Sequence, residues 1–261
     1  MKVGFIGGGN LGSSLVRGLL KSGTLKAKDI IVSDLDESKL KNLNKLGVKT
    51  TTDNRKLVND CDVVFIAVKP NIVESALKEV NDVSHDKIFI SAAAGISTKF
   101  IEARTKARVV RTMPNTCGAV GEMASCFSLG KRATPKDAKL VERLLGGIGT
   151  TFRVDEKMME AVTGLSGSGP AYFYVFIRAM QQAGVGLGLS NEIALKLAAQ
   201  TAKGAGEMVL KTGGVDDLIK QVYTQKGTTI AGIDVLEDRK VADAIKEAVK
   251  AATKRAKELY R

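Results

Sequence analysis

Residues 3–12 read Val3-Gly4-Phe5-Ile6-Gly7-Gly8-Gly9-Asn10-Leu11-Gly12, an apolar run that leads directly into a glycine-rich turn. The run predicts a buried strand, and the glycines follow it with the G-x-G-x-x-G spacing. In this setting the first glycine permits a tight turn, the second lets the backbone approach a pyrophosphate, and the third lets the next helix pack on the strand. The helix N-terminus adds free amides and a partial positive charge. The stretch therefore predicts a Rossmann-type dinucleotide site formed by Gly7, Gly8, Gly9, Asn10, Leu11 and Gly12.

The second predicted strand ends beside a carboxylate. Ile30–Ser33 is a short apolar run, and Asp34 follows it. A carboxylate at this place accepts hydrogen bonds from the ribose hydroxyls of adenosine, unless Asp34 is simply an acid that precedes the next helix. If it faces the ribose, its charge repels a 2′-phosphate and favours NADH, whereas Ser33 and Lys39 leave NADPH open. We assign Ser33 and Asp34 to the cofactor site and expect NADPH or NADH as cofactor.

Short apolar runs alternate with amphipathic stretches through the first half of the chain. The predicted strands are Lys2–Ile6, Ile30–Ser33, Val48–Thr50, Val63–Ala67, Ile88–Ser91, Arg108–Thr112, Met123–Leu129 and Thr151–Val154. Amphipathic helices are predicted at Leu11–Lys21, Asp36–Leu46 and Ile72–Val80, and another begins with Thr134 as N-cap and Pro135 at its first position. This alternation is typical of an α/β domain in which helices cover a parallel sheet.

The pattern changes after Asp155. Strand signals stop, and long helices are predicted at Pro170–Ala183, Asn191–Lys211 and Val241–Leu259, the second capped by Ser190. We therefore expect two domains, a dinucleotide-binding Rossmann domain over residues 1–155 and an all-helical domain for substrate binding and oligomerisation over residues 156–261. Because a small helical domain often buries an apolar run such as Tyr172–Ile177 against a second subunit, we expect a homodimer or a higher homo-oligomer.

Composition narrows the class of partner. The 261 residues include 40 Lys and Arg against 28 Asp and Glu, for a formal net charge of +12. The basic residues are spread along the chain and interleaved with acids, and no compact basic run carries aromatic residues, so no nucleic-acid partner is expected. No apolar run approaches the roughly 20 residues of a membrane helix, and the N-terminal residues lack the apolar stretch of a signal peptide.

The three cysteines, Cys61, Cys117 and Cys126, show no C-x-x-C spacing. This scatter argues against a zinc site or a disulfide framework and fits a reducing compartment. We therefore expect no metal, no membrane partner and a cytoplasmic location.

Four further segments carry a family resemblance. They are Ala67-Val68-Lys69-Pro70, Arg111-Thr112-Met113-Pro114-Asn115-Thr116, Gly164-Leu165-Ser166-Gly167-Ser168-Gly169-Pro170-Ala171-Tyr172 and Gly227-Thr228-Thr229-Ile230-Ala231-Gly232. In order and content they resemble the pyrroline-5-carboxylate reductase family, over nearly the whole chain. One loop departs from that family's usual Ser-Pro-Gly-Gly-Thr-Thr pattern, because it reads Thr224-Gln225-Lys226-Gly227-Thr228-Thr229 here.

The resemblance implies an NAD(P)H-dependent reduction of L-1-pyrroline-5-carboxylate to L-proline, the last step of proline biosynthesis. It implies that the substrate carboxylate meets the consecutive amides of the Gly-Thr-Thr turn, with Thr229 as the catalytic residue, its hydroxyl near the imine nitrogen. The remaining implied substrate residues are Glu156, Ser166, Gly167, Ser168, Gly227 and Thr228. The further implied cofactor residues are Asn54, Val68, Lys69, Pro70 and Ala93.

A protonated imine is already electrophilic, so hydride transfer mostly needs orientation and exclusion of water. This agrees with the single histidine of the chain, His85, which lies in the polar segment Asn81–Lys87. A histidine acid/base mechanism is therefore hard to build, and we expect His85 at the surface.

Three alternatives remain open at this point. One is a related Rossmann oxidoreductase acting on another cyclic imine. Another acts on a β-hydroxy acid, although such enzymes typically use a lysine on the first helix of the second domain, and no lysine lies between Pro170 and Lys196. The third is a non-catalytic dinucleotide sensor, which would not need the second anion site at Gly227–Thr229.

Overall fold

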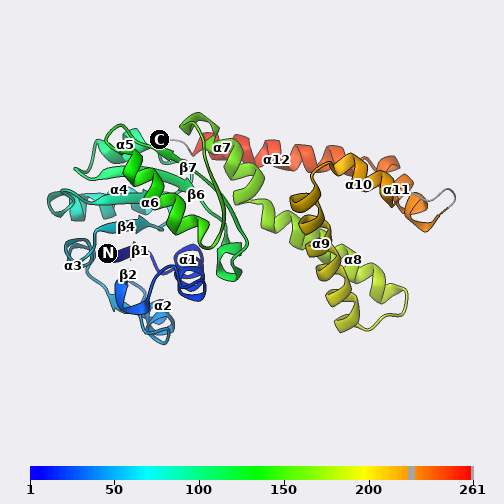
Figure 1. The fold of residues 1–261 in the computed structure, drawn as a ribbon, viewed down its shortest axis with the longest axis horizontal. Coiled ribbons are helices and arrows are strands. Elements are labelled where there is room, and N and C mark those ends of the chain that lie inside the picture. Colours follow the sequence, from blue (N-terminus) through cyan, green and yellow to red (C-terminus); the bar gives the residue numbers. More distant parts are fainter. Residues whose placement is uncertain (223–226, 260–261) are drawn as a thin grey trace. The chain divides into compact units, whose positions relative to one another are not determined.

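The computed structural model describes residues 1–222 and 227–259 of the chain (Figure 1). The loop residues Thr224–Lys226, where the sequence departs from the Ser-Pro-Gly-Gly-Thr-Thr pattern, lie outside the described residues. Contacts divide the chain into two compact units, Met1–Ser168 together with Lys250–Arg261, and Gly169–Val249. The domain boundary between residues 155 and 156 stays a prediction. The contacts place the division later because the segment after Asp155 still packs on the sheet, where Met159 and Glu160 are buried.

The first unit is built on one sheet of eight strands in the order β3-β2-β1-β4-β5-β6-β7-β8. The strands are β1 Val3–Ile6, β2 Ile30–Ser33, β3 Lys49–Thr51, β4 Val63–Ile66, β5 Ile88–Ser91, β6 Arg108–Met113, β7 Met123–Leu129 and β8 Gly149–Arg153. Within the described residues every neighbouring pair is parallel except β6 and β7. These two are antiparallel because only residues 114–122, with a short 3-10 helix at Thr116–Val120, join them, and a parallel crossover needs a longer connection.

Helices cover both faces of this sheet, as the alternating pattern predicts (Figure 1). They are α1 Asn10–Lys21, α2 Glu37–Asn44, α3 Asn54–Asp60, α4 Pro70–Val80, α5 Thr98–Glu102, α6 Pro135–Gly146 and α7 Met159–Val162. One apolar cluster includes Phe5, Leu15 and Leu144, and a second includes Leu57 and Leu77. The central strands are buried on both faces, which explains why they are continuous apolar runs rather than alternating ones.

The strand order reverses at β1, which has β2 on one side and β4 on the other. In open α/β sheets a crevice forms at such a reversal, outside the carboxyl ends of the strands. The fold therefore places a natural ligand crevice where β1 leads into the Gly7–Gly9 turn.

The predicted caps are confirmed. The Thr134 hydroxyl accepts from the Asp137 amide, and the Asp137 carboxylate accepts from the Thr134 amide in return, which completes a capping box. Ser190 caps its helix by accepting from the Ile193 amide at 3.3 Å.

The last helix of the chain ends in the first unit. Ala256 is buried there, and Gly95 follows β5 with a φ of +72°. A Cβ added to Gly95 would lie 2.6 Å from the carbonyl oxygen of Leu259, so the end of this helix lies directly against the loop.

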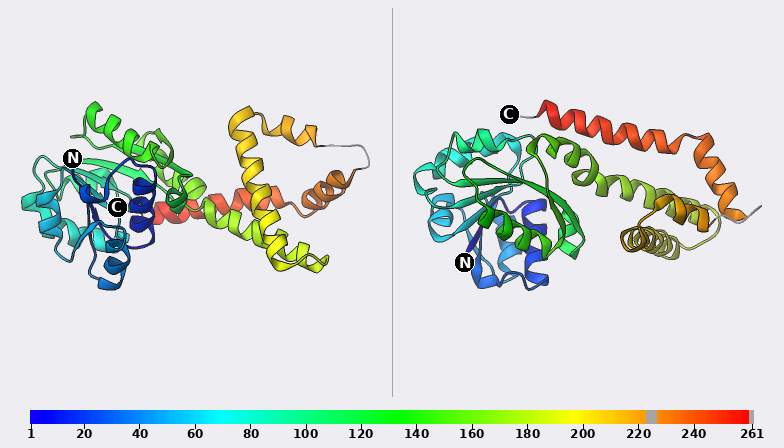
Figure 2. Two further views of the ribbon diagram at one scale, coloured as in Figure 1. Left: turned by 60° about the horizontal axis from the view of Figure 1, so that its bottom comes forward. Right: turned by 45° about the horizontal axis from the view of Figure 1, so that its top comes forward.

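The second unit is helical, and β8 is the last strand among the residues described. Its helices are α8 Gly169–Gly186, α9 Asn191–Thr212, α10 Val215–Gln221, α11 Thr228–Asp238 and the beginning of α12 Val241–Glu258. Helices α8 and α9 pack on one another, with Gly184 against Ala194 (Figure 2). Many large apolar side chains of this unit stay exposed, Phe173 by 64% and Leu210 by 80%. In the described part of the chain, no helix combines the length and apolar character needed to span a membrane.

Candidate dinucleotide-binding site

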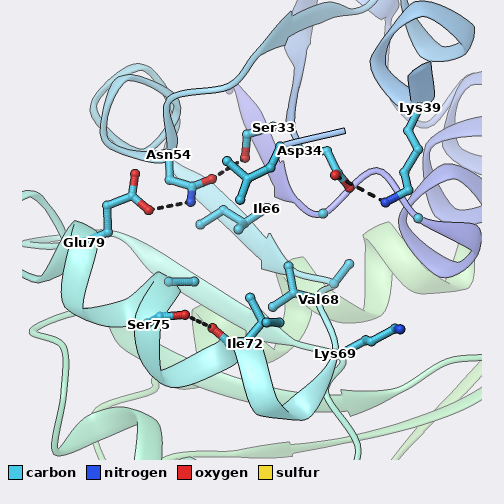
Figure 3. Close-up of a pocket in the computed structure, with 15 residues that line it drawn as sticks. Ile6, Ser33, Asp34, Lys39, Asn54, Val68, Lys69, Ile72, Ser75 and Glu79 are labelled. Carbon is cyan, nitrogen blue, oxygen red and sulfur yellow. Dashed lines mark hydrogen bonds and ion pairs between the residues drawn. The ribbon is translucent and has the colours of Figure 1, made fainter. Parts of the chain in front are cut away.

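A cavity of about 490 Å³ opens at the carboxyl ends of β1, β2 and β4 (Figure 3). Seven of the residues assigned to the cofactor from the sequence line it, namely Gly7, Gly9, Ser33, Asp34, Asn54, Val68 and Lys69. Asn10, Leu11 and Gly12 form the first turn of α1 instead, and Pro70 is the first residue of α4. Ala93 is buried behind β5, outside the described cavity lining.

The three motif glycines have three different environments. Gly7 has a φ of +109°, and an added Cβ would lie 2.6 Å from the Ala67 carbonyl oxygen. A Cβ on Gly12 would collide with the Gly7 carbonyl oxygen, so the helix approaches the turn too closely for any side chain. A Cβ on Gly9 meets no described atom within 4 Å. Gly9 is thus the position where a ligand can approach the backbone at the start of α1, and the turn fits a pyrophosphate.

The Asp34 carboxylate is fixed by backbone amides. Its Oδ2 accepts from the Gly8 amide at 2.8 Å, and its Oδ1 accepts from the Asp36 amide at 2.9 Å. Asp36, rather than Asp34, caps α2 by accepting from the Ser38 amide, so Asp34 is not merely a helix start. The carboxylate is held against the glycine turn and lines the cavity.

Lys39 stands beside this carboxylate. Its Nζ lies 3.3 Å from Asp34 Oδ1 and 3.5 Å from Asp36 Oδ2. The negative charge of Asp34, with a smaller contribution from Asp36, raises the pKa of the Lys39 ammonium. Hydrogen bonds from Ser38 lower the pKa of the Asp36 carboxyl. Both shifts keep these groups charged and paired.

Asn54 connects two sides of the cavity. Its Oδ1 accepts from the Ser33 hydroxyl at 2.6 Å, and its Nδ2 donates to Glu79 Oε2 at 2.8 Å. Sequence reasoning missed Glu79. The signal was present, however, because Ile72, Ala76 and Glu79 share one face of α4 at helical spacing and all three line the cavity.

Glu156 takes part in a buried ion network. Its carboxylate accepts from both the amide and the hydroxyl of Thr98 at 2.7 Å, and it lies 3.5 Å from Arg111 Nη1. The Arg111 side chain is fully buried, and its Nη2 lies 2.7 Å from Glu160 Oε1. The network ties the segment after β8 to β6 and to the start of α5.

The predicted Ser166–Ser168 turn follows this network. The segment Thr163–Gly167 forms a π-helical turn, a distortion that occurs frequently at functional sites. The Ser166 carbonyl accepts from Asn115 Nδ2 at 3.0 Å, and the Ser168 amide donates to the Thr163 carbonyl at 2.9 Å. A Cβ on Gly167 would lie 3.2 Å from Met113 Sδ. The residues after β6 therefore hold the turn in place.

The predicted Gly-Thr-Thr turn lies in the second unit. Gly227 is the N-cap of α11, and Thr228 and Thr229 are its first two residues. No side chain in the described ranges caps this helix, and uncapped amides of a first turn are the groups that can bind an anion. His85 is exposed, as predicted. Among residues 1–222 and 227–259, no cluster of His, Cys, Asp and Glu is suited to hold a metal ion.

Comparison with known proteins identifies the family. Residues 156–259 match the family described as pyrroline-5-carboxylate reductase dimerisation, and residues 2–95 match NADP oxidoreductase coenzyme F420-dependent. Pyrroline-5-carboxylate reductase of Methanosarcina acetivorans is 42% identical over 99% of this chain and 97% of its own length. The Arabidopsis thaliana enzyme of that name is 42% identical over 99% of this chain and 95% of its own length.

The fold comparison agrees with the sequence comparison. The crystal structure of Plasmodium falciparum pyrroline carboxylate reductase with NADP bound has a TM-score of 0.92 and 31% identity. It covers 100% of this chain and 98% of the other. The likeness thus extends through both the Rossmann and the helical parts. The chain belongs to the pyrroline-5-carboxylate reductase family.

Proposed function

We propose that this chain reduces the C=N bond of 1-pyrroline-5-carboxylate to give proline, with NADH or NADPH as the hydride donor. Hydride from the reduced nicotinamide adds to the carbon of the protonated imine, whose nitrogen keeps its proton. The cyclic imine thus becomes a cyclic amine, and the nicotinamide is oxidised. The observation that carries the proposal is the cavity at the strand-order reversal, where Gly9 leaves the backbone open and Asp34 is held by the turn. Relatives named for this activity that match along the whole chain support the same reaction.

On the cofactor side, the chain's task is to bind and orient. The open backbone at Gly9 and the first turn of α1 face a pyrophosphate, with Asn10, Leu11 and Gly12 shaping that turn. Asp34 accepts from the adenosine ribose. The segment after β4, Val68-Lys69-Pro70, and Ala93 after β5 follow strands whose carboxyl ends meet at this edge of the sheet. The dinucleotide supplies the hydride; the protein supplies its position.

On the substrate side, we assign the carboxylate to the start of α11. Gly227 supplies no capping side chain, so the amides of Thr228 and Thr229 and the helix dipole are available to a negative charge. The Thr229 hydroxyl oxygen then accepts from the N–H of the protonated imine and orients the ring. This role makes Thr229 the catalytic residue of the proposal.

The remaining substrate residues belong to the first unit. Ser166, Gly167 and Ser168 form or follow the π-helical turn that Asn115 holds by its carbonyl, and we assign them to the substrate pocket. Glu156 contributes to this pocket by fixing the segment that leads into the turn, because its carboxylate is bound to Thr98 and Arg111.

The second unit points to self-association. Its match to a dimerisation family and its exposed apolar helices support a homo-oligomer in which a second copy of this chain covers those helices. The scattered cysteines support the cytoplasm as its location.

The test is reduced-nicotinamide oxidation by the purified protein, followed by loss of absorbance on addition of 1-pyrroline-5-carboxylate. Thr229→Ala is expected to lower kcat/KM for the imine at least about tenfold, with the Kd for the dinucleotide unchanged. Thr150→Ala, at an exposed position on β8, is the matched control and should keep full activity. Protein that binds a dinucleotide but turns over no imine would contradict the proposal and favour the sensor alternative.

A further inference from the structure

The ribose-2′ side of the cavity carries an excess of negative charge. Residues 33–39 contain three carboxylates, Asp34, Asp36 and Glu37, and a single ammonium group, Lys39. Of these, Asp34 is fixed most firmly, because both of its oxygens accept backbone amides and its side chain is only 14% exposed. One of those amides belongs to Gly8, so the carboxylate keeps a constant position relative to the glycine turn.

Lys39 is the cation of this segment that could bind a 2′-phosphate, but it is already paired with carboxylates. Its ammonium lies 3.3 Å from Asp34 (Figure 3). It also lies 3.5 Å from Asp36, so it is shared between two carboxylates. A phosphate of roughly two negative charges would have to compete with both acids for this one cation. A ribose hydroxyl, in contrast, can donate to the remaining lone pairs of the Asp34 carboxylate without disturbing the pair.

Among the described lining residues, the other cation is Lys69, which is the N-cap residue of α4 and not part of the β2 end. Ser33, Asn54 and Glu79 are linked in one chain of hydrogen bonds, which ends in another carboxylate. Arg55, next to Asn54, is bound by Asp82 through two contacts of 2.6 and 2.7 Å.

We propose that the end of β2 selects the unphosphorylated ribose of NADH over the 2′-phosphoribose of NADPH, with Asp34 as the selecting residue and Lys39 as its charge partner. This inference rests on the proposed assignment of the cavity to a dinucleotide. It assigns cofactor preference to this chain's own residues, although the Plasmodium falciparum relative was solved with NADP.

The test is direct titration of the purified protein with NADH and with NADPH, without imine, followed by the fluorescence of the bound reduced nicotinamide. We expect NADH to bind at least about tenfold more tightly, and a rise in ionic strength to narrow the difference because salt screens the repulsion. Asp34→Asn should shift the ratio of the two Kd values at least about tenfold towards NADPH. The variant keeps an oxygen that can accept from Gly8, and its thermal transition checks that it is folded.

Glu37→Gln is the charge-matched control. It changes the net charge of the same segment by the same amount, but its side chain is outside the described cavity lining, and it should shift the ratio less than about threefold. In the Asp34→Asn protein the Lys39 ammonium no longer pairs with residue 34 and can bind the 2′-phosphate. A further Lys39→Gln change should therefore remove the increase in affinity for NADPH.

Two results would overturn the inference. One is a wild-type protein that binds NADPH as tightly as NADH and loses NADPH alone on Lys39→Gln, which would make Lys39 a phosphate anchor. The other is an Asp34→Asn protein with an unchanged ratio. The titration is independent of the reaction because it contains no imine. If the protein binds NADH selectively here but reduces no imine in the separate activity assay, the proposed reaction is contradicted and this inference stands. Protein that binds neither dinucleotide would overturn both.

Discussion

In the first unit β1, β2, β4 and β5 are buried along their whole length, whereas in the second unit only Gly169, Ala194 and Ala198 are buried among the described residues of 169–249. The first unit therefore supplies its own core. The second has helices of regular length but almost no interior, and its exposed apolar surface is of the kind that association with another molecule covers. The two units therefore differ in how much of their apolar surface the fold of this chain buries by itself.

The largest difference between the two units is expected from a pair of matched phenylalanine variants. Phe173 on α8 and Phe152 on β8 are exposed to nearly the same extent, 64% and 62%. Phe173→Glu is expected to abolish the proposed oligomer at micromolar concentration and to lower the helical content, because it places a charge in the apolar surface that we propose a second copy covers. Light scattering and circular dichroism measure both effects.

Phe152→Glu serves as the control for that experiment. It makes the same chemical change at the same exposure in the unit that has its own core, and it should alter stability by no more than about 0.5 kcal/mol. If both variants stay assembled, or both fall apart, the division between the two units is wrong.

A second prediction concerns the interior of the first unit. Arg111→Met would leave the buried Glu160 carboxylate without its cation, and we expect a loss of about 3–5 kcal/mol in the free energy of unfolding. Urea titration of the variant gives the number. Arg55→Met is the comparison variant, because its pair with Asp82 is largely exposed, and it should leave the free energy of unfolding nearly unchanged. Equal losses of unfolding free energy in the two variants would mean that burial of the Arg111–Glu160 pair adds nothing to its effect on stability.

The smallest effects are expected in the glycine turn, where stability and binding should separate. Gly12→Ala must push α1 away from the Gly7 carbonyl and should lower stability by about 1–3 kcal/mol. Gly9→Ala has room for its methyl group, so it should unfold like the wild type yet bind the dinucleotide at least about tenfold more weakly. Thermal unfolding and NADH titration of both variants separate the two roles. If the Gly9→Ala protein binds NADH with wild-type affinity, the assignment of the pyrophosphate to this turn is wrong.

Much of the fold was predictable because its determinants are local. Ile30–Ser33 and Ile88–Ser91 are observed with the predicted bounds, since a short apolar run bounded by polar residues marks where a buried strand begins and ends. Thr134 and Ser190 cap the helices that they were predicted to cap, because a capping hydroxyl needs only the next three residues.

What escaped prediction depends on contacts between distant residues. The sequence predicts strands around Met123 and Thr151, but the antiparallel pairing of β6 and β7 follows from the short path that joins them. The pairing of Arg111 with Glu160 joins residues 49 positions apart, and the sequence around either residue does not predict it. The same holds for Glu79, which reaches Asn54 only because α4 lies next to α3. In the cofactor site, therefore, the residues that touch the turn were predictable, and those that position them were not.

The contact between Gly95 and the end of α12 has a topological consequence. Because Lys250–Arg261 belongs to the first unit, the helical unit is an insertion, anchored to its host at both its entry and its exit. Opening of the insertion releases a closed loop rather than a free tail, and a closed loop gains less conformational entropy. The contact of Leu259 with Gly95 thus limits the conformational entropy that the helical unit gains when it unfolds.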